Sequence, residues 1–180
     1  ADELKPTSKE AFDMLRAQGV KTVLLSGDNK ACADFIGSQL GADRVYAGGL
    51  TEQKAEILRE LRREFGEVMM IGDGINDAPA LAEADVGCAI GGGSDIAIES
   101  ADIVLMKDDP RDAARAIRLS RLTIRNIKQN LFWAFCYNTI CIPIAAGVLY
   151  PALRLLLDPM LAGLAMSLSS ICVVGNALRL

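Results

Sequence analysis

The chain has 180 residues, 51% of them apolar, and a formal net charge of −4 without a single histidine. We expect no nucleic-acid partner, because binding to a phosphate backbone requires a basic surface that this charge balance does not supply. The cysteines are scattered without a C-x-x-C pair, which favours a reducing compartment over a disulfide framework. The length predicts one domain of ordinary size together with an additional segment.

Residues 1–110 alternate short apolar runs with helical patterns. Strand-like runs lie at 23–25, 68–71, 86–90 and 103–106, and residues 55–65 have helical spacing. Pro6 can start a first helix and Gly19 can end it. This alternation predicts a doubly wound α/β domain with a mostly parallel sheet, in which chemistry collects at the carboxyl ends of the strands.

Polar residues follow two of the predicted strands and therefore share one edge of the sheet. Ser26, Gly27 and Asp28 come after the first run, and the carboxylates of Asp73 and Asp77 come after the second. A plain turn needs one Gly or Asn and gains nothing from crowded acids, so a bound cation is the better explanation. The edge therefore suits a phosphoryl group with Mg²⁺, which Asp73 would bind.

Lys54 is out of place for a helix start. If Thr51 caps the helix, Lys54 stands at the third helical position, where a capping box favours Glu and the helix dipole disfavours a cation. Local rules are broken most often at functional sites. We expect Lys54 and Ser26 to hold phosphate oxygens.

Two uncharged runs, at 131–150 and 159–178, have the length of membrane-spanning helices. We therefore predict a connecting amphipathic helix at 111–130, a first span at 131–150, an extracytoplasmic loop at 151–158 and a second span at 159–178. The connecting segment is rich in arginine and lysine, whereas the loop has only Arg154 and Asp158. The positive-inside rule then places both chain ends in the cytoplasm.

The loop Gly72-Asp73-Gly74-Ile75-Asn76-Asp77-Ala78-Pro79 resembles the hinge motif G-D-G-x-N-D-x-P of the P-type ATPases, a branch of the haloacid dehalogenase-like superfamily. Ser26-Gly27-Asp28 resembles the T-G-D motif of that family, and Lys54 matches its phosphate-contacting lysine. The resemblance implies a partial haloacid dehalogenase-like (Rossmann-like) α/β domain followed by two transmembrane helices. The implied catalytic residues are Ser26, Gly27, Asp28, Lys54, Asp73, Asn76 and Asp77, with Gly72 and Gly74 at the cofactor site.

The apolar half resembles the copper(I)-transporting, heavy-metal class of these pumps. Its signature residues are Tyr137 and Asn138 in the first run and Met166 and Ser170 in the second. A thioether beside neutral oxygens suits soft copper(I) better than Zn²⁺ or Ca²⁺, which favour carboxylates or histidines. Cys141 lies on the same helix face as Tyr137 but outside the pattern of the family, so it is a weaker candidate.

The resemblance implies a segment of an ATP-driven copper(I) exporter in the cell membrane, a multi-pass enzyme that uses Mg²⁺ and ATP. The sequence has neither the phosphorylated-aspartate motif D-K-T-G-T nor the membrane motif C-P-C. We therefore expect the chain to be inactive alone, as the C-terminal piece of a longer pump or as a split or degenerate product. Its expected partners are the phosphorylated-aspartate loop, the nucleotide-binding and actuator domains, the other membrane helices, lipid and a copper chaperone.

Two alternatives stay open. One is a membrane-anchored dehalogenase-like phosphatase, although none of the aspartates lies in a D-x-D-x-T context. The other is a non-catalytic fragment that binds copper or a partner through the two apolar runs. The sequence encoded upstream of Ala1 would distinguish the three hypotheses.

Overall fold

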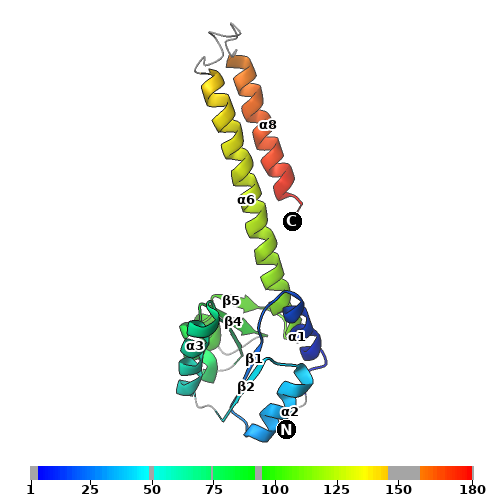
Figure 1. Ribbon diagram of the computed structural model, residues 1–180, viewed down its shortest axis with the longest axis vertical. Helices are drawn as coiled ribbons and strands as arrows, with labels where there is room; N and C mark the ends of the chain where they lie inside the picture. The colour runs from blue at the N-terminus through cyan, green and yellow to red at the C-terminus, as the bar shows by residue number, and fades with distance from the viewer. Residues whose placement is uncertain (1–3, 49–50, 74, 92–94, 146–158, 180) are drawn as a thin grey trace. The chain divides into compact units, whose positions relative to one another are not determined.

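The computed structural model of the chain describes residues 4–48, 51–73, 75–91, 95–145 and 159–179. It divides into two compact units, Ala1–Ile117 and Arg118–Leu180. The predicted alternation of strands and helices is confirmed in the first unit (Figure 1). Its strands are β1 (Val23–Ser26), β2 (Arg44–Ala47), β3 (Met69–Gly72), β4 (Val86–Ile90) and β5 (Ile103–Leu105).

The helices of the first unit lie between these strands in the chain. They are α1 (Ser8–Ala17), α2 (Lys30–Leu40), α3 (Thr51–Phe65), the 3₁₀ turn η1 (Ile75–Asp77), α4 (Ala78–Glu83), α5 (Asp95–Glu99) and the start of α6 (Arg111–Ala145). Helix α1 ends before Gly19, whose φ of 73° lies in the left-handed region that glycine favours. Helix α3 already includes Thr51, so Thr51 is its first residue rather than its cap.

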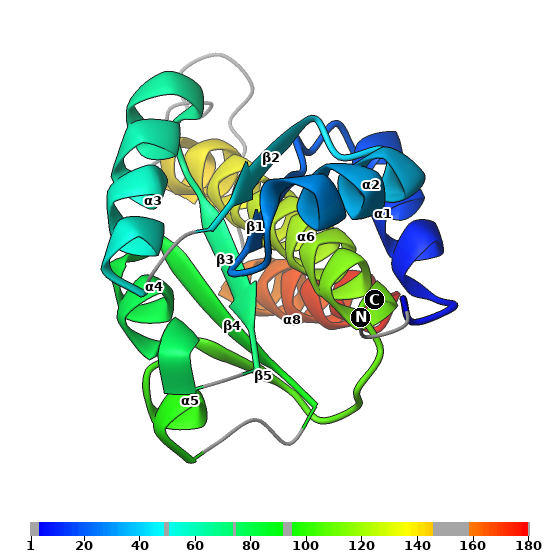
Figure 2. The ribbon, with the colours of Figure 1, turned by 90° about the horizontal axis from the view of Figure 1, so that it is seen from below.

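All the described strand pairs are parallel. They form two sheets, one of order β1-β2 and one of order β3-β4-β5. Helices α3 and α4 lie on one side of the strands and α1 and α2 on the other (Figure 2). Leu58 of α3, Met70 of β3 and Leu81 of α4 form a buried cluster, against which Leu25 of β1 packs. Both sheets therefore pack against the same apolar cluster.

An aspartate directly precedes β2, β4 and β5, the strands that come later in the chain than the strand with which each pairs. Each of these aspartates donates its backbone N–H to one residue of the neighbouring strand end and accepts the N–H of that same residue with its carboxylate. The pairs are Asp43 with Thr22, Asp85 with Val68 and Asp102 with Gly87. The carboxylate bonds measure 2.9, 2.8 and 2.8 Å. We call these contacts the aspartate clamps, and they fix the register at the amino ends of the strands.

The clamp at Asp43 includes a neighbouring cation and has a strongly lowered pKa. The backbone N–H of Thr22, followed by the ammonium of Lys21, lowers the pKa of Asp43 to about 2. The Lys21 Nζ lies 3.0 Å from the Asp43 carboxylate, and the Thr22 hydroxyl donates to it at 3.1 Å. Because ionised Asp43 is favoured in the folded state, its contribution to stability is present above the unfolded pKa of about 4 and is lost as the pH falls toward 2.

We predict that Asp43→Ala lowers the free energy of unfolding by about 1.5–3 kcal/mol at neutral pH, the usual range for a hydrogen bond to a charged group. The difference from the native chain should shrink between pH ~5 and ~2 as the native carboxyl becomes protonated. Urea unfolding followed by far-UV circular dichroism at several pH values measures both effects. Exposed Asp34→Ala is the control, and a pH-independent difference for Asp43→Ala would contradict the clamp.

The second unit contains the rest of α6 and the helix α8 (Pro159–Ala177). Within the described residues, no helix combines the length with the apolar composition needed to cross a bilayer. The predicted spans at 131–150 and 159–178 are therefore not confirmed. Only residues 131–145 of the first run are described, and the predicted loop at 151–158 lies outside the described residues.

Candidate functional site

The turn after β1 is built from its own polar side chains. The Ser26 hydroxyl accepts the backbone N–H of Asp28 at 3.1 Å, and the Asn29 side chain caps α2 by accepting the N–H of Cys32 at 2.9 Å. Gly48, which follows β2, donates its N–H to the carbonyl of Asp28 at 2.9 Å. The loops after the two strands are therefore joined, and Ser26 keeps a hydroxyl hydrogen to donate.

The loop after β3 is arranged around Asp77. A Cβ at Gly72 would lie 2.7 Å from the Cβ of Asp77 and 2.9 Å from its Oδ2, so only glycine allows this side chain to fold back over the strand end. The Lys54 Nζ lies 2.7 Å from Asp77 Oδ1, and the two side chains are only 16% and 15% exposed. The ion pair explains why a lysine is tolerated near the start of α3, because the carboxylate offsets the unfavourable helix dipole.

The predicted residues thus fall into two groups. Asp77 is brought against both Lys54 and Gly72. Asp28 donates to Ser26 and accepts from Gly48. Of the remaining predicted residues, Gly27, Asp73 and Asn76 are exposed, and Gly74 lies outside the described residues.

Exposed oxygen donors make the β3 loop compatible with Mg²⁺. In the part of the chain that the structure describes, no three His, Cys, Asp or Glu side chains gather in the manner of a complete metal site. Mg²⁺ does not need such a cage, because it keeps several waters and is usually bound by one or two carboxylates plus phosphate oxygens. Asp73, exposed at the end of β3, offers one such carboxylate.

The second unit contains a buried amide cluster that joins α6 to α8. Asn126, only 8% exposed, donates to the backbone carbonyl of Asn176 at 2.8 Å. The Asn176 side chain donates in turn to Asn126 Oδ1 at 3.1 Å and to Asn130 Oδ1 at 2.8 Å. Asn126 was missed in the sequence, although two asparagines four residues apart on a helix are a signal, because asparagine is a poor helix former.

The predicted copper ligands lie on these two helices. Tyr137 and Asn138 belong to α6, and Met166 and Ser170 to α8, although the side chain of Met166 lies outside the described residues. The Asn138 amide donates to the carbonyl of Ala134 at 3.0 Å, so its nitrogen is bonded within its own helix. Tyr137 lies beside the thiol of Cys172, a neighbour that sequence reasoning did not select.

The first unit has a haloacid dehalogenase-like α/β fold. The family described as haloacid dehalogenase-like hydrolase matches residues 1–85 of the chain. That match covers the strands β1 to β3 and the Lys54 and Asp77 pair. The fold and the site of the first unit therefore resemble those of the dehalogenase-like hydrolases.

The homologues of the whole chain are more specific. The chain is 56% identical over its full length to "Copper-transporting ATPase 2" of Rhizobium meliloti and 55% identical to the "Copper-exporting P-type ATPase" of Vibrio cholerae. It spans 22% and 20% of the length of these two relatives. A crystal structure of a zinc-transporting PIB-type ATPase in its E2.Pi state is 36% identical, with a TM-score of 0.86, over 99% of this chain and 28% of that one.

We predict that Lys54 and Asp77 are energetically coupled. In a double-mutant cycle of Lys54→Met and Asp77→Asn, the double variant should lose about 1–2 kcal/mol less than the two single variants together, because each single change leaves a poorly solvated charge alone. Urea unfolding at neutral pH measures the cycle.

The matched control is the exposed pair of Lys9 and Asp13, whose side chains are 64% and 50% exposed at a distance of 3.3 Å. Its coupling energy should stay below about 0.5 kcal/mol. Equal coupling energies in the two pairs would show that the Lys54 and Asp77 contact stabilises the fold no more than an exposed ion pair does.

Proposed function

We propose that the chain is the C-terminal segment of an ATP-driven copper(I) exporter. In this proposal the first unit supplies the Mg²⁺-binding half of the phosphorylation site and the second unit part of the transport site. The proposal rests on two observations taken together. Lys54 and Asp77 form an ion pair at a G-D-G-x-N-D loop. The full chain is more than 50% identical to copper-transporting ATPases.

The residues of the first unit have separate tasks in this proposal. Lys54 binds a phosphate oxygen and Ser26 donates a hydrogen bond to another, so both hold the phosphoryl group in place for transfer. Asp77 fixes the ammonium of Lys54 at 2.7 Å and thereby positions it. Asp73 holds Mg²⁺, which supplies charge neutralisation for the transferring group. Asn76 and the Gly27 and Asp28 turn line the same edge.

The phosphorylated aspartate would come from another part of the pump. In the described part of the first unit, β1 pairs only with β2 and β3 pairs only with β4. Each therefore has one edge with unpaired backbone groups, which is a template for an added strand. Leu25 of β1 and Met70 of β3 share one buried cluster, so both edges belong to one layer. We propose that the strand bearing the aspartate pairs there.

The membrane placement is part of the same proposal. The uncharged runs at 131–150 and 159–178 would cross the bilayer in the assembled pump, with both chain ends in the cytoplasm. Support comes from exposed apolar side chains on both helices, among them Phe135 at 63% and Ile171 at 68%. Surfaces of this kind are costly in water and are covered by lipid or by other helices.

The transported ion would be copper(I) rather than Zn²⁺. Tyr137, Asn138, Met166 and Ser170 offer a thioether and neutral oxygens, a set too soft and too poor in charge for a dehydrated hard dication. The zinc-transporting structure is 36% identical to the chain, whereas the copper relatives are 56% and 55% identical. The identities therefore favour copper.

We predict that Asp73→Asn in the full-length pump slows Mg²⁺-dependent phosphoenzyme formation from ATP by roughly 100-fold, because a carboxylate that binds the metal is removed where charge develops. Copper(I) affinity should stay unchanged. Acid-quenched phosphorylation with labelled ATP measures the rate, and exposed Glu67→Gln is the matched control. Phosphoenzyme formed at the normal rate by the Asp73 variant would refute the role of this carboxylate.

For the membrane site, we predict that Met166→Ala in the full-length pump lowers copper(I) binding and copper-stimulated ATP hydrolysis together, since the thioether is the soft donor of the set. Titration of ATPase activity with copper(I) under reducing conditions, and separately with Zn²⁺, measures selectivity. Met106→Ala, at a side chain 88% exposed in the first unit, is the control. Equal stimulation by Zn²⁺, or an unchanged copper response in the Met166 variant, would contradict the assignment.

A further inference from the structure

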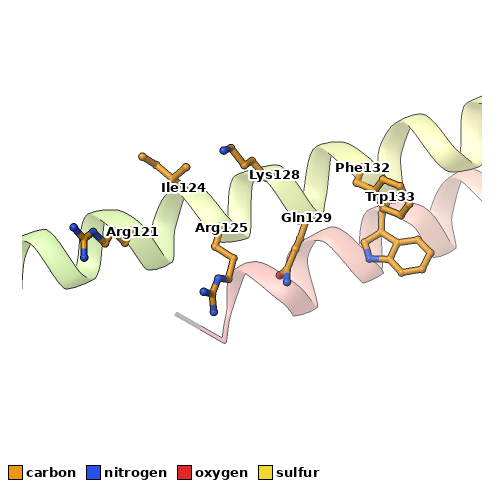
Figure 3. A pocket seen from close by; sticks show the side chains of 7 residues that line it. All are labelled: Arg121, Ile124, Arg125, Lys128, Gln129, Phe132 and Trp133. Atoms are coloured by element: carbon orange, nitrogen blue, oxygen red, sulfur yellow. The ribbon is translucent and has the colours of Figure 1, made fainter. Parts of the chain in front are cut away.

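A pocket of about 430 Å³ lies along α6 in the second unit (Figure 3). Its walls are two rows of side chains spaced four residues apart, which form neighbouring ridges on a helix. One row is Arg121, Arg125, Gln129 and Trp133, and the other is Ile124, Lys128 and Phe132. Figure 3 shows Arg125, Gln129 and Trp133 projecting to one side of the helix and Ile124 and Lys128 to the other. The pocket is the groove between these ridges.

The chemistry of this groove changes along the helix. Cations line its first part and the aromatic pair of Phe132 and Trp133 its last, with ring centroids 5.6 Å apart at an interplanar angle of 71°. Arg125 and Trp133 are two turns apart, or about 12 Å along the helix axis. A ligand that fills the groove therefore needs an anionic end and an apolar end.

Two cations of the groove, Arg125 and Lys128, lie in a stretch of the chain without acidic residues. Residues 113–157 contain no aspartate or glutamate. Within the described residues, Arg125 and Lys128 take part in no ion pair. The aromatic end is open to its surroundings, since Phe132 is 64% and Trp133 50% exposed. A ligand of this groove must therefore offer negative charge to the cations and apolar surface to the aromatic rings.

We propose that this groove binds the headgroup of an anionic phospholipid at the membrane interface. Arg125 and Lys128 contact the phosphate, Gln129 hydrogen-bonds the headgroup or glycerol oxygens, and Phe132 and Trp133 lie against the upper acyl chains. Free phosphate would leave the aromatic end uncovered, and a nucleic acid would not extend toward an uncharged run. The proposal rests on the membrane placement in the proposed function.

Trp133 is the only tryptophan of the chain and so reports on the groove directly. The full 180-residue chain is reconstituted in vesicles of phosphatidylcholine mixed with increasing fractions of brominated phosphatidylglycerol or, separately, brominated phosphatidylcholine. Bromine quenches nearby indole fluorescence, so the two series give the relative binding constant of the anionic lipid. We expect a preference of roughly 5- to 30-fold, as one to two cations near a membrane surface would give.

The double variant Arg125→Gln with Lys128→Gln should lose this preference, and Arg125→Lys should retain it. The matched control, Lys30→Gln with Arg63→Gln, removes the same charge from exposed positions of the first unit and should leave the preference unchanged. Far-UV circular dichroism checks that each variant keeps its helices.

The outcomes separate the two proposals. If Trp133 is not quenched in any vesicle, the membrane placement of the proposed function fails. If quenching occurs equally with both lipids, that placement stands and the headgroup site is refuted. A preference that survives the Arg125 and Lys128 changes, or one that is lost in the Lys30 and Arg63 control, also refutes it. Loss of the preference on adding inorganic phosphate at constant ionic strength would show a site for free phosphate instead.

Discussion

The ion pair between Lys54 and Asp77 is the contact on which the geometry of the site depends. It joins the first turn of α3 to the turn after β3 and is mostly shielded from water. The elements that carry these two segments also pack together through the buried cluster of Leu58, Met70 and Leu81. This apolar packing sets the distance between α3 and the β3 loop, and the ion pair forms across that distance. The buried packing thereby makes this charged contact rigid, which the proposed phosphoryl-transfer site would require.

The parts of the candidate site that could be selected from the sequence are those that a local rule covers. Gly72 and the turn of Ser26 to Asp28 satisfy such a rule within a few residues, and Lys54 breaks one. What the sequence did not reveal was the partner: Lys54 was predicted to contact phosphate, a role that stays a prediction, and its pairing with Asp77 across 23 positions came only with the structure. Periodicity indicates which face is buried but not which distant residue it meets.

The aspartate clamps show the same limit in the fold. Strand β2 was not predicted, because its four residues begin with a charged arginine and are too few for a period-2 pattern. In the structure it is specified from outside, by the carboxylate of Asp43 and the backbone of Thr22, 21 residues apart. Long-range hydrogen bonds of this kind stabilise a strand whose own sequence is weak.

The two units treat positive charge in opposite ways. In the first unit Arg44, Arg59 and Arg111 each bind a carboxylate, so their charge is used within the fold. All acidic residues of the chain except Asp158 lie before residue 113. Within the described residues of the second unit, Arg125 and Lys128 take part in no ion pair with a carboxylate. Its helices are joined instead by neutral amides around Asn126, which hold two helices together without placing a charge between them. These neutral internal contacts, together with the cations of Arg125 and Lys128, suit the anionic and apolar surrounding that we propose for this helix pair.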